Sequence, residues 1–353
     1  MTEKDLNYVI GVLKDEATEP PSDWYAVLGF LQGHRVAGLF YNRAKKQGLV
    51  LPKKAEKLLS EMFMRQKRRV QFMRTYIREL SENLNAANAE HIMLKGSVLS
   101  NLATPGFHIY EDGERVSNDI DLLVKPDGIG AAEKVLRSLG YMQGEYDSEK
   151  GGMRTFSRQE IVMRRMNRGE TAPFIKLTDN PEIPFVEADI NFSLGNTPDE
   201  GRELLAEMVE SGRQYKGKVQ LRVPEEELFF LHLILHQYKE SCLYFMAERG
   251  KELELYKLAD IYYLWKAAAF DAEKLQSIVQ RYGISEKLGA VLWQVGEVFD
   301  DAALRNTAEE YGAVQPYVLD YTAKKLYLYA VPVRERICAF DATHFLCERG
   351  ALR

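Results

Sequence analysis

The sequence predicts an α+β protein in which a core with a mixed β-sheet is flanked along the chain by two helical regions. Three observations support this fold class. Apolar residues follow helical spacing up to about residue 90 and again after about residue 224, short β-type runs lie between these limits, and no repeat or low-complexity linker interrupts the chain. We therefore expect an N-terminal helical region at 1–90, a core at 91–223 and a C-terminal helical region at 224–353.

The N-terminal region is expected to contain four helices. Proline and glycine in the stretches EPPSD and GLVLP separate them, because these residues end helices. The last helix is long and amphipathic, with Phe63, Val70 and Ile77 on one face. The predicted helices are 4–16, 23–32, 35–47 and 53–90.

The core is expected to alternate short strands with short helices. Glycine and polar residues bound each β-type run, and Gly140 closes the second helix. The predicted strands are 91–94, 119–124, a broad stretch at 153–178, 185–192 and 219–223, and the predicted helices are 97–103 and 128–140.

The C-terminal region is expected to be helical almost to its end. Pro224 and the three acids that follow it form a strong helix start. The predicted helices are 225–248, 252–269, 272–282, 285–299, 307–327 and 332–346.

Composition limits the class of protein. With 46% hydrophobic and 28% charged residues, the chain resembles an ordinary folded protein. Its net charge of −5 disfavours a surface that coats nucleic acid, although a local basic patch is not excluded. The first residues show no signal-type apolar run, and the longest apolar run, at 228–235, is interrupted by His232. We expect a cytoplasmic protein with no membrane partner.

Two carboxylates lie on one face of the strand DIDLLV. Asp119 and Asp121 are about 7 Å apart along the strand, and like charges so placed are unfavourable unless a cation offsets them. A third acid, Asp189, follows in FVEADINF and shares a strand face with Glu187. Three such carboxylates fit a two-metal site for phosphoryl transfer. Glu187 is expected either to join them or to face solvent.

A glycine-serine turn precedes this strand. In LKGS, Gly96 would let the backbone approach a phosphate, and Ser97 could cap a helix and hydrogen-bond to a phosphate oxygen. Lys95 and Arg115 could neutralise phosphate charge or pair with the carboxylates when no nucleotide is bound. The order of strand, Gly-Ser turn, helix, DxD strand and later Asp strand is more informative than the turn alone.

These segments resemble a known family. HIMLKGSVLSNL, Arg115 four residues before Asp119, and EADINF match the pattern of the uncharacterised nucleotidyltransferase family within the DNA polymerase β-like superfamily. The resemblance extends over roughly residues 20–265. Asn191 stands where the family commonly has histidine, and Ala188 stands where valine is common, but neither difference removes a metal ligand.

The resemblance implies specific roles for the site residues. Asp119 and Asp121 would bind metal, and Asp189 would be the third carboxylate, acting as metal ligand or base. Gly96 and Ser97 would hold the nucleotide phosphates. The implied fold is a polymerase β-like nucleotidyltransferase core.

The sequence thus predicts a magnesium-dependent nucleotidyltransferase. It would transfer a nucleoside monophosphate from an NTP to an acceptor hydroxyl and release pyrophosphate, with two Mg²⁺ ions, or Mn²⁺ in their place. The acceptor could be a small molecule, a protein or RNA. Two alternatives remain open: a glycosyltransferase that binds a nucleotide diphosphate through the DxD, and a non-catalytic nucleotide-binding or toxin–antitoxin interaction protein.

For other charged residues the sequence leaves more than one role open. The basic residues near the expected sheet could reach the triphosphate or only guard strand edges; they are Arg164, Arg165, Arg168 and Lys176. Asp260, in the apolar stretch LADIYYL, is expected to brace a basic residue of the core in preference to contacting the acceptor. Six basic residues and no acid occur at 62–78, which we interpret as a solvated helix flank.

Overall fold

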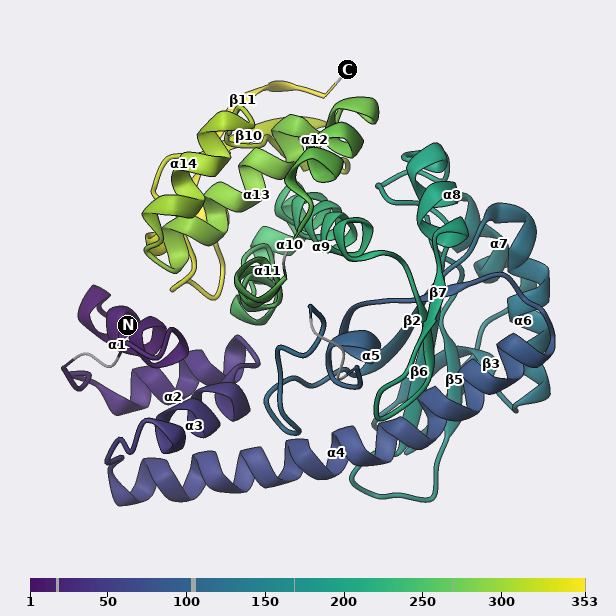
Figure 1. Ribbon diagram of the computed structural model, residues 1–353, viewed down its shortest axis with the longest axis horizontal. Helices are drawn as coiled ribbons and strands as arrows, with labels where there is room; N and C mark the ends of the chain where they lie inside the picture. The colour runs from purple at the N-terminus through teal and green to yellow at the C-terminus, as the bar shows by residue number, and fades with distance from the viewer. Residues whose placement is uncertain (17–18, 103–105, 168, 269, 353) are drawn as a thin grey trace. The chain divides into compact units, whose positions relative to one another are not determined.

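The computed structural model describes residues 1–16, 19–102, 106–167, 169–268 and 270–352 (Figure 1). The chain divides into two compact units. The first unit comprises Met1–Arg65, Leu233–Lys266 and Asp271–Arg353, and the second comprises Gln66–His232 and Ala267–Phe270. The chain passes from one unit to the other within α4 (Lys53–Ala86) and again within α9 (Glu226–Ser241). None of the described helices is both long and apolar enough to cross a membrane.

A six-stranded mixed sheet lies in the second unit, and with the helices of the chain it confirms the predicted fold class. Its strands have the order β1-β2-β6-β5-β3-β4. β2 (Asp119–Leu123) and β6 (Phe185–Asn191) are parallel neighbours, whereas the other neighbouring strands are antiparallel. The remaining strands are β1 (Ile92–Met93), β3 (Met142–Asp147), β4 (Gly152–Thr155) and β5 (Phe174–Leu177).

Burial alternates along β6. Val186, Ala188 and Ile190 are fully buried, whereas Glu187 and Asp189 on the other face are partly exposed. One face of the strand therefore belongs to the core and the other presents acids. A slip of one residue would bury the acids in the apolar layer, so this alternation fixes the register of β6.

The helices of the second unit are short apart from α4. In α6 (Ile129–Ser138), the buried residues Ile129, Ala132, Val135 and Leu136 follow helical spacing. The other helices are α5 (Lys95–Leu99), the 3₁₀ turn η1 (Pro126–Gly128), α7 (Arg158–Asn167) and α8 (Arg202–Glu210). A separate two-stranded sheet pairs β7 (Arg213–Tyr215) with β8 (Leu221–Val223).

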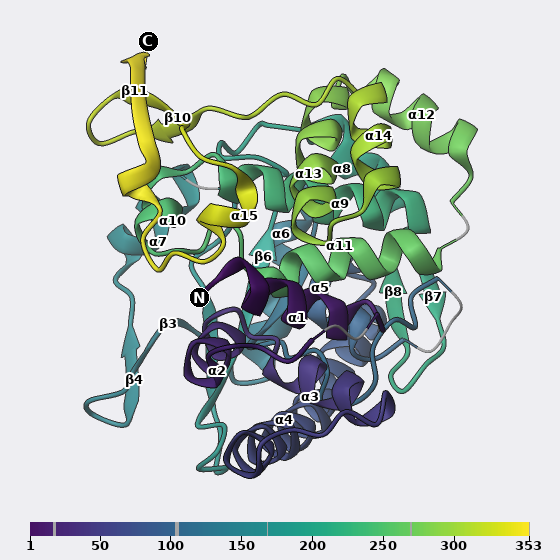
Figure 2. The same ribbon diagram turned by 90° about the vertical axis from the view of Figure 1, so that its left-hand side faces the viewer.

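The first unit is mainly helical. Its helices are α1 (Glu3–Leu13), α2 (Trp24–Gly33), α3 (Ala37–Lys46), α10 (Tyr244–Glu248), α11 (Leu255–Ala267), α12 (Ala272–Arg281), α13 (Ser285–Val298), α14 (Ala302–Glu310) and α15 (Val333–Arg336). A three-stranded sheet packs on α10 through a small core of Ala247, Val318, Tyr329 and Ala342 (Figure 2). Its strands are β9 (Val318–Asp320), β10 (Lys325–Tyr329) and β11 (Leu346–Ala351), with the 3₁₀ turn η2 (Thr343–Phe345) before β11.

The long helices predicted at 307–327 and 332–346 are wrong, because only the end of α14 lies in the first range and only the four-residue α15 and the turn η2 lie in the second. α14 ends at Glu310, and the chain then forms β9 and β10. The Asp320 carboxylate accepts hydrogen bonds from the amides of Thr322 and Ala323, and Lys324 has a left-handed φ of 54°, so a tight turn joins the two strands. The sequence LYLY in β10 pairs on both sides and has the strand period that we interpreted as helical.

The prediction of a continuous β-type stretch at 153–178 is also wrong, because α7 interrupts it. The Ser157 hydroxyl accepts from the Glu160 amide, and the Glu160 carboxylate accepts from the Ser157 amide at 2.8 Å. This reciprocal pair is a capping box, a helix-start signal present in the sequence SRQE. Val162 and Met163, which suggested a strand, lie half-exposed on the helix.

The helix after LKG begins earlier than predicted. α5 starts at Lys95, and Leu94 occupies the N-cap position without a side-chain hydrogen bond. Ser97 lies inside the helix, so it does not cap it. The predicted strand at 219–223 is β8, which pairs with β7 and not with the six-stranded sheet.

Candidate metal centre

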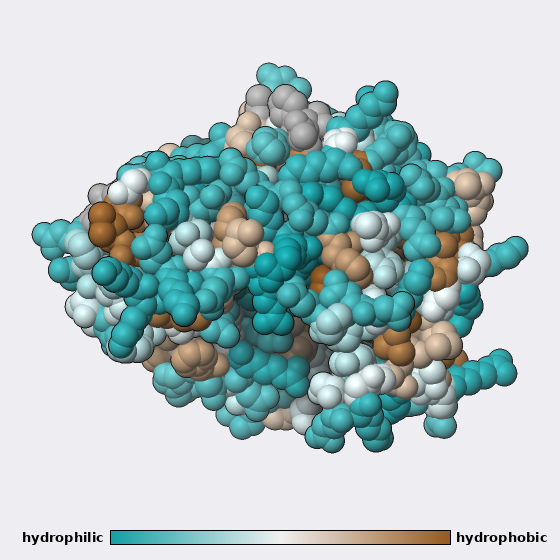
Figure 3. Space-filling model, turned by 90° about the horizontal axis from the view of Figure 1, so that it is seen from below, coloured by the Kyte–Doolittle hydropathy of each residue, from teal (hydrophilic) through white to brown (hydrophobic). Residues whose placement is uncertain are grey.

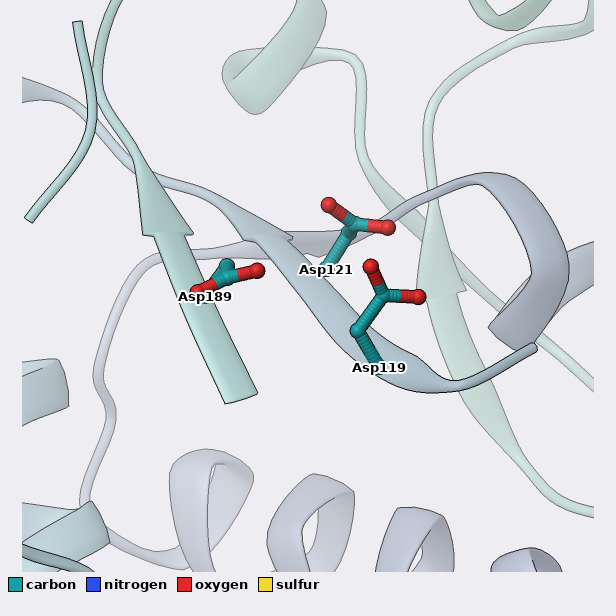
Figure 4. Close-up of side chains that lie close together, drawn as sticks. All are labelled: Asp119, Asp121 and Asp189. Carbon is teal, nitrogen blue, oxygen red and sulfur yellow. The ribbon is translucent and has the colours of Figure 1, made fainter. Parts of the chain in front are cut away.

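Three aspartates converge where β2 and β6 lie side by side. In the parallel register, Asp119 is opposite Glu187, and Asp121 is opposite Asp189. One carboxylate oxygen from each of Asp119, Asp121 and Asp189 lies within 4.8 Å of the others. Figure 4 shows the two β2 side chains and the β6 side chain directed toward one another. The spatial convergence predicted from DIDLLV and EADINF is therefore present.

The carboxylates of this centre repel one another in a desolvated setting. Asp121 is only 3% exposed. Burial, together with the charges of Glu187, Asp121 and Asp119, raises the pKa of Asp189 well above its ordinary value. Burial also raises the pKa of Asp121, although Lys95 opposes that shift. Among the described residues, Asp189 has neither an ion pair nor a hydrogen bond, so its charge has no protein partner there.

Glu187 and Glu170 enlarge the acidic group. Burial raises the pKa of Glu187 to about 7, and the charges of Asp119, Asp121 and Glu170 add to the effect. Glu170 lies opposite Asn191 in an isolated antiparallel bridge and raises the pKa of Asp189 as well. Sequence reasoning missed Glu170, because nothing in the local sequence shows that the chain returns to β6 at this residue.

Lys95 supplies a positive charge to the centre. Its Nζ lies 2.8 Å from Oδ1 of Asp121. The backbone at Lys95 has a φ of +47°, in the left-handed region that residues with a side chain rarely adopt. This conformation occurs at the point where β1 gives way to α5. Of the two roles predicted for Lys95, pairing with a carboxylate is the one seen here.

Gly96 and Ser117 fix the position of Asp119. A Cβ atom at residue 96 would lie 2.6 Å from the Ser117 hydroxyl oxygen and 2.7 Å from the Ser117 Cβ. Ser117 in turn donates to the backbone oxygen of Asp119 at 2.7 Å, with a longer contact of 3.1 Å to its Oδ1. Glycine at 96 is therefore required for the close approach of the loop that precedes β2.

Ser97 and Arg115 are both buried. Ser97 has no solvent exposure, and its hydroxyl has no hydrogen-bond partner among the described residues. Arg115 is 7% exposed, its guanidinium donates to the backbone oxygen of Val116, and its own backbone oxygen accepts from Ser100 Oγ at 3.1 Å. Their predicted contacts with nucleotide remain predictions.

Arg74 on α4 holds the loop between α5 and β2. Its guanidinium donates to Asn101 Oδ1 at 2.8 Å, to Asp112 Oδ2 at 2.9 Å and to the backbone oxygen of Ser100 at 3.2 Å. The hydrogen bond from Arg74 holds the pKa of Asp112 well below its ordinary value. Sequence reasoning missed this brace, although Arg74 belongs to the basic run at 62–78.

The interpretation of the basic run at 62–78 as a solvated helix flank therefore applies only to part of the run. The Arg68 side chain is 55% exposed and pairs with Glu182, whereas the Arg74 side chain is only 12% exposed. Figure 3 shows the molecule from the side on which α4 lies in Figure 1, and that face is mostly hydrophilic.

The remaining charged candidates are not brought to the carboxylates by any described contact. Lys176 lies opposite Val186 in the β5–β6 ladder, on the face away from the acids, and pairs with Glu79 at 3.0 Å. Arg164 belongs to α7 and not to a strand, and its guanidinium lies over the ring of Phe156. Arg165 is exposed on the same helix, Arg168 lies outside the described residues, and Asp260 is buried on α11 of the first unit.

The donor set of the centre suits a hard divalent cation. All three converging groups are carboxylates, and oxygen ligands of this kind are those that Mg²⁺ and Mn²⁺ prefer. A cation there would also offset the repulsion that raises the pKa of Asp189. Asp119, Asp121 and Asp189 are the residues that would hold it.

One of the comparisons with known proteins gives a match. The family model described as uncharacterised nucleotidyltransferase matches residues 20–300, which is well over half of the chain and includes every carboxylate of the centre. No curated protein and no solved structure matches the chain. The family match confirms the resemblance predicted from LKGS, DIDLLV and EADINF. The chain belongs to the uncharacterised nucleotidyltransferase family.

Proposed function

We propose that the protein is a Mg²⁺-dependent nucleotidyltransferase that transfers a nucleoside monophosphate from an NTP to an acceptor hydroxyl. The observation that carries the proposal is the convergence of Asp119, Asp121 and Asp189 within 4.8 Å on adjacent parallel strands. Membership of a nucleotidyltransferase family supports the reaction class. The acceptor can be a small molecule, a protein side chain or an RNA end.

The metal ligands in this proposal are the three aspartates. Bound Mg²⁺ supplies a Lewis acid that favours ionisation of the attacking hydroxyl and stabilises negative charge on the phosphates, and two such ions suit phosphoryl transfer. Asp121 is held in place by β2 and by its pair with Lys95, and Asp119 is held by Ser117. These contacts orient the ligands before substrate binds.

The proposed reaction balances with pyrophosphate as the leaving group. The acceptor oxygen forms a bond to the α-phosphorus, and the bond from the α-phosphorus to the bridging oxygen of the β-phosphate breaks. The hydroxyl proton passes to a base, for which Asp189 is the candidate because its raised pKa favours holding a proton. Asp189 serves either as that base or as a third metal ligand.

The turn at 95–97 is the proposed phosphate site. Lys95 would exchange its contact with Asp121 for a phosphate oxygen once a cation neutralises the carboxylates. The Ser97 hydroxyl has no hydrogen-bond partner among the described residues, and a phosphate oxygen would satisfy it if the turn opens toward the ligand. Arg115 is the second proposed cation for the phosphates.

Label transfer tests the proposal. The protein is incubated with Mg²⁺ and each α-labelled NTP, with and without cell extract, beside the variants Asp119→Asn and Asp189→Asn. Asp127→Asn, which removes an exposed acid in η1, is the matched control. Transfer of the α-label by the wild type and the control, but not by the site variants, supports the proposal. Sugar transfer from a nucleotide sugar, or nucleotide binding with no turnover, overturns it.

A further inference from the structure

The first unit contains a cavity that is separate from the carboxylate centre of the second unit. Its volume is about 450 Å³, and it is bounded by α13, by residues 313–316 and by residues 331–336. Cavities of about 300–1,000 Å³ are typical of small-molecule sites. The space is therefore sufficient for a ligand with a ring-sized body.

The walls of the cavity are largely apolar. Trp293 on α13 contributes an indole ring, and Pro316, Val331 and Pro332 contribute aliphatic surface. Ala290 lies in the same wall and leaves room where a larger side chain would fill the space. Such walls favour an apolar or ring-bearing ligand body.

A buried arginine lies in this cavity wall. Arg336 at the end of α15 is 4% exposed, and its guanidinium lies 3.8 Å over the ring of Tyr329. It forms no ion pair with any described residue, and its Nε has no hydrogen-bond partner there. A buried cation that forms no direct ion pair is costly, and an anionic ligand would offset that cost.

Nearby arginines show that this is a property of the site and not of the region. Arg305 pairs with Asp300 at 3.1 Å, and Arg334 donates to the backbone oxygen of Val298 at 2.9 Å. The charge of Glu252 acts on Arg336, and Glu252 is a buried acid whose pKa is raised to about 7 by desolvation. Glu252 therefore neutralises Arg336 only in part at neutral pH.

Another buried polar atom in this neighbourhood lacks a partner. Oε1 of Gln237 has no hydrogen-bond partner among the described residues, whereas the buried Tyr329 hydroxyl interacts with Arg336. Gln237 donates to Gln294, which lines the cavity, at 3.3 Å. Unsatisfied buried groups that cluster beside a cavity indicate a polar ligand group or ordered water.

We infer that this cavity binds a small organic anion, with a carboxylate on Arg336 and an apolar body against Trp293 and the prolines. A guanidinium holds a carboxylate through two parallel hydrogen bonds, and Arg336 is the arginine that lines the cavity. Glu297 and Glu309 also line the cavity; Glu297 lies 3.7 Å from Arg305, and Glu309 is exposed. A cationic ligand is the competing possibility that these acids raise, and the test distinguishes it.

Three probes of the same shape test which ligand charge the cavity prefers. Adamantane-1-carboxylate, adamantane-1-carboxamide and adamantan-1-amine are titrated into the full-length protein, with calorimetry and tryptophan fluorescence as readouts. Trp293→Phe identifies the fluorescence that belongs to the cavity. We expect the carboxylate to bind at least about tenfold more tightly than the amide, since hydrogen bonds to a charged group are stronger than those between neutral groups. No binding of the carboxylate, or equal or tighter binding of the amide or the amine, overturns the inference.

Two variants test whether the probes bind in this cavity. Arg336→Gln should lower carboxylate affinity at least about tenfold and leave the amide unchanged, while Arg334→Gln, two residues away, should leave both unchanged. If Arg336→Gln does not fold, Ala290→Leu decides, because it fills the cavity and retains the arginine. Ala290→Leu should abolish binding of both probes. Unchanged carboxylate binding in Ala290→Leu, or in a folded Arg336→Gln, overturns the inference.

Discussion

The two units treat buried charge in opposite ways. In the first unit, Lys257 lies between two acids, with its Nζ 2.7 Å from Glu254 and a closer contact to Glu240. In the second unit, acids from β2 and β6 gather, and Lys95 forms an ion pair with one of them, Asp121. The first arrangement has its counter-charge in the protein, whereas the second has too little of it.

This difference distinguishes a cluster whose charges are paired within the protein from one that is suited to an added cation. The pKa of Lys257 is raised because nearby carboxylates outweigh the effect of burial, so the cluster holds its charges as they are. The pKa values of Asp121 and Asp189 are raised because burial and like charges disfavour ionisation. Only the second cluster would gain from an added cation. The predictions below change each cluster in turn.

The largest expected effect is that of Asp189→Asn on transfer. Loss of one metal ligand or base should lower the rate by about a thousandfold or more, which is about 4 kcal/mol in the barrier. The same change should stabilise the metal-free protein, because it removes a crowded carboxylate. Initial rates of α-label transfer and thermal unfolding in a chelator check both parts.

Magnesium should make the wild type more stable than Asp189→Asn, which is the reverse of the order expected in a chelator. Adding Mg²⁺ should raise the unfolding temperature of the wild type and of Asp127→Asn, but not that of Asp189→Asn. Near-normal transfer by Asp189→Asn, or a loss of stability in the chelator, would contradict the contrast between the two clusters.

Lys257→Met should have the next largest effect, and on stability alone. It leaves Glu240 and Glu254 buried without their cation, so the free energy of unfolding should fall by about 3 kcal/mol. The control is Lys266→Met, whose side chain is 46% exposed and pairs with Asp301 at 2.7 Å. The control should lose less than about 1 kcal/mol.

Chemical denaturation of the two lysine variants measures the difference. Adding Glu240→Gln to Lys257→Met should restore part of the lost stability, because one unpaired charge is removed. Equal losses of unfolding free energy in Lys257→Met and Lys266→Met would show that the buried cluster contributes no more to stability than a surface ion pair does.

Gly96→Ala should have a moderate effect on the second unit. The added methyl group meets Ser117, which holds Asp119, so affinity for Mg²⁺ and NTP should fall by about tenfold, or about 1.4 kcal/mol. Ser117→Ala separates the loss of the hydrogen bond from the steric clash. Calorimetric titration with Mg²⁺ and a non-hydrolysable NTP gives the affinities.

The double variant Gly96→Ala/Ser117→Gly shows which partner needs the glycine. If crowding of Ser117 is the cause, the double variant should bind as Ser117→Gly does. If the backbone at residue 96 approaches a phosphate, the affinity of the double variant for NTP, but not for Mg²⁺, should remain about tenfold lower. Normal NTP affinity in Gly96→Ala would remove the turn from the proposed site.

The sequence predicted the convergence of the aspartates because the alternation of side chains along a strand determines which residues share a face. Asp119 and Asp121 had to share one face of β2, and Asp189 had to oppose the buried Val186, Ala188 and Ile190. The parallel pairing that sets Asp121 beside Asp189 follows from the order of the strands in the sheet, which no local pattern encodes.

The parts that were missed depend on contacts between distant residues or on turn signals. Glu170 reaches the centre through a bridge to Asn191, and Arg74 reaches the loop before β2 from another helix. The left-handed backbone at Lys95 is not visible in residue type. By contrast, the capping box at Ser157 and the turn at Asp320 were present in the sequence, and weighing them would have predicted α7 and β9–β10.

The smallest expected effect is a pH dependence that differs between the units. The pKa values of Glu187 and Glu252 are both raised from 4.5 to about 7, with burial as the largest cause. Each therefore binds more protons when folded. The stability that each contributes is complete below pH 4.5 and is lost as pH rises through about 7.

Magnesium should affect only one of these contributions. Glu187 is also raised by Asp119, Asp121 and Glu170, and a cation bound to the aspartates would offset that repulsion. In chelator, Glu187→Gln and Glu252→Gln should each flatten the fall in unfolding free energy between pH 4.5 and 7, on the order of 1 kcal/mol apiece. With saturating Mg²⁺, the difference between Glu187→Gln and the wild type should become smaller across this range, because the contribution of burial remains, whereas the difference for Glu252→Gln should be unchanged. An equal response of both variants to Mg²⁺ would mean that the two clusters do not differ in their need for a cation.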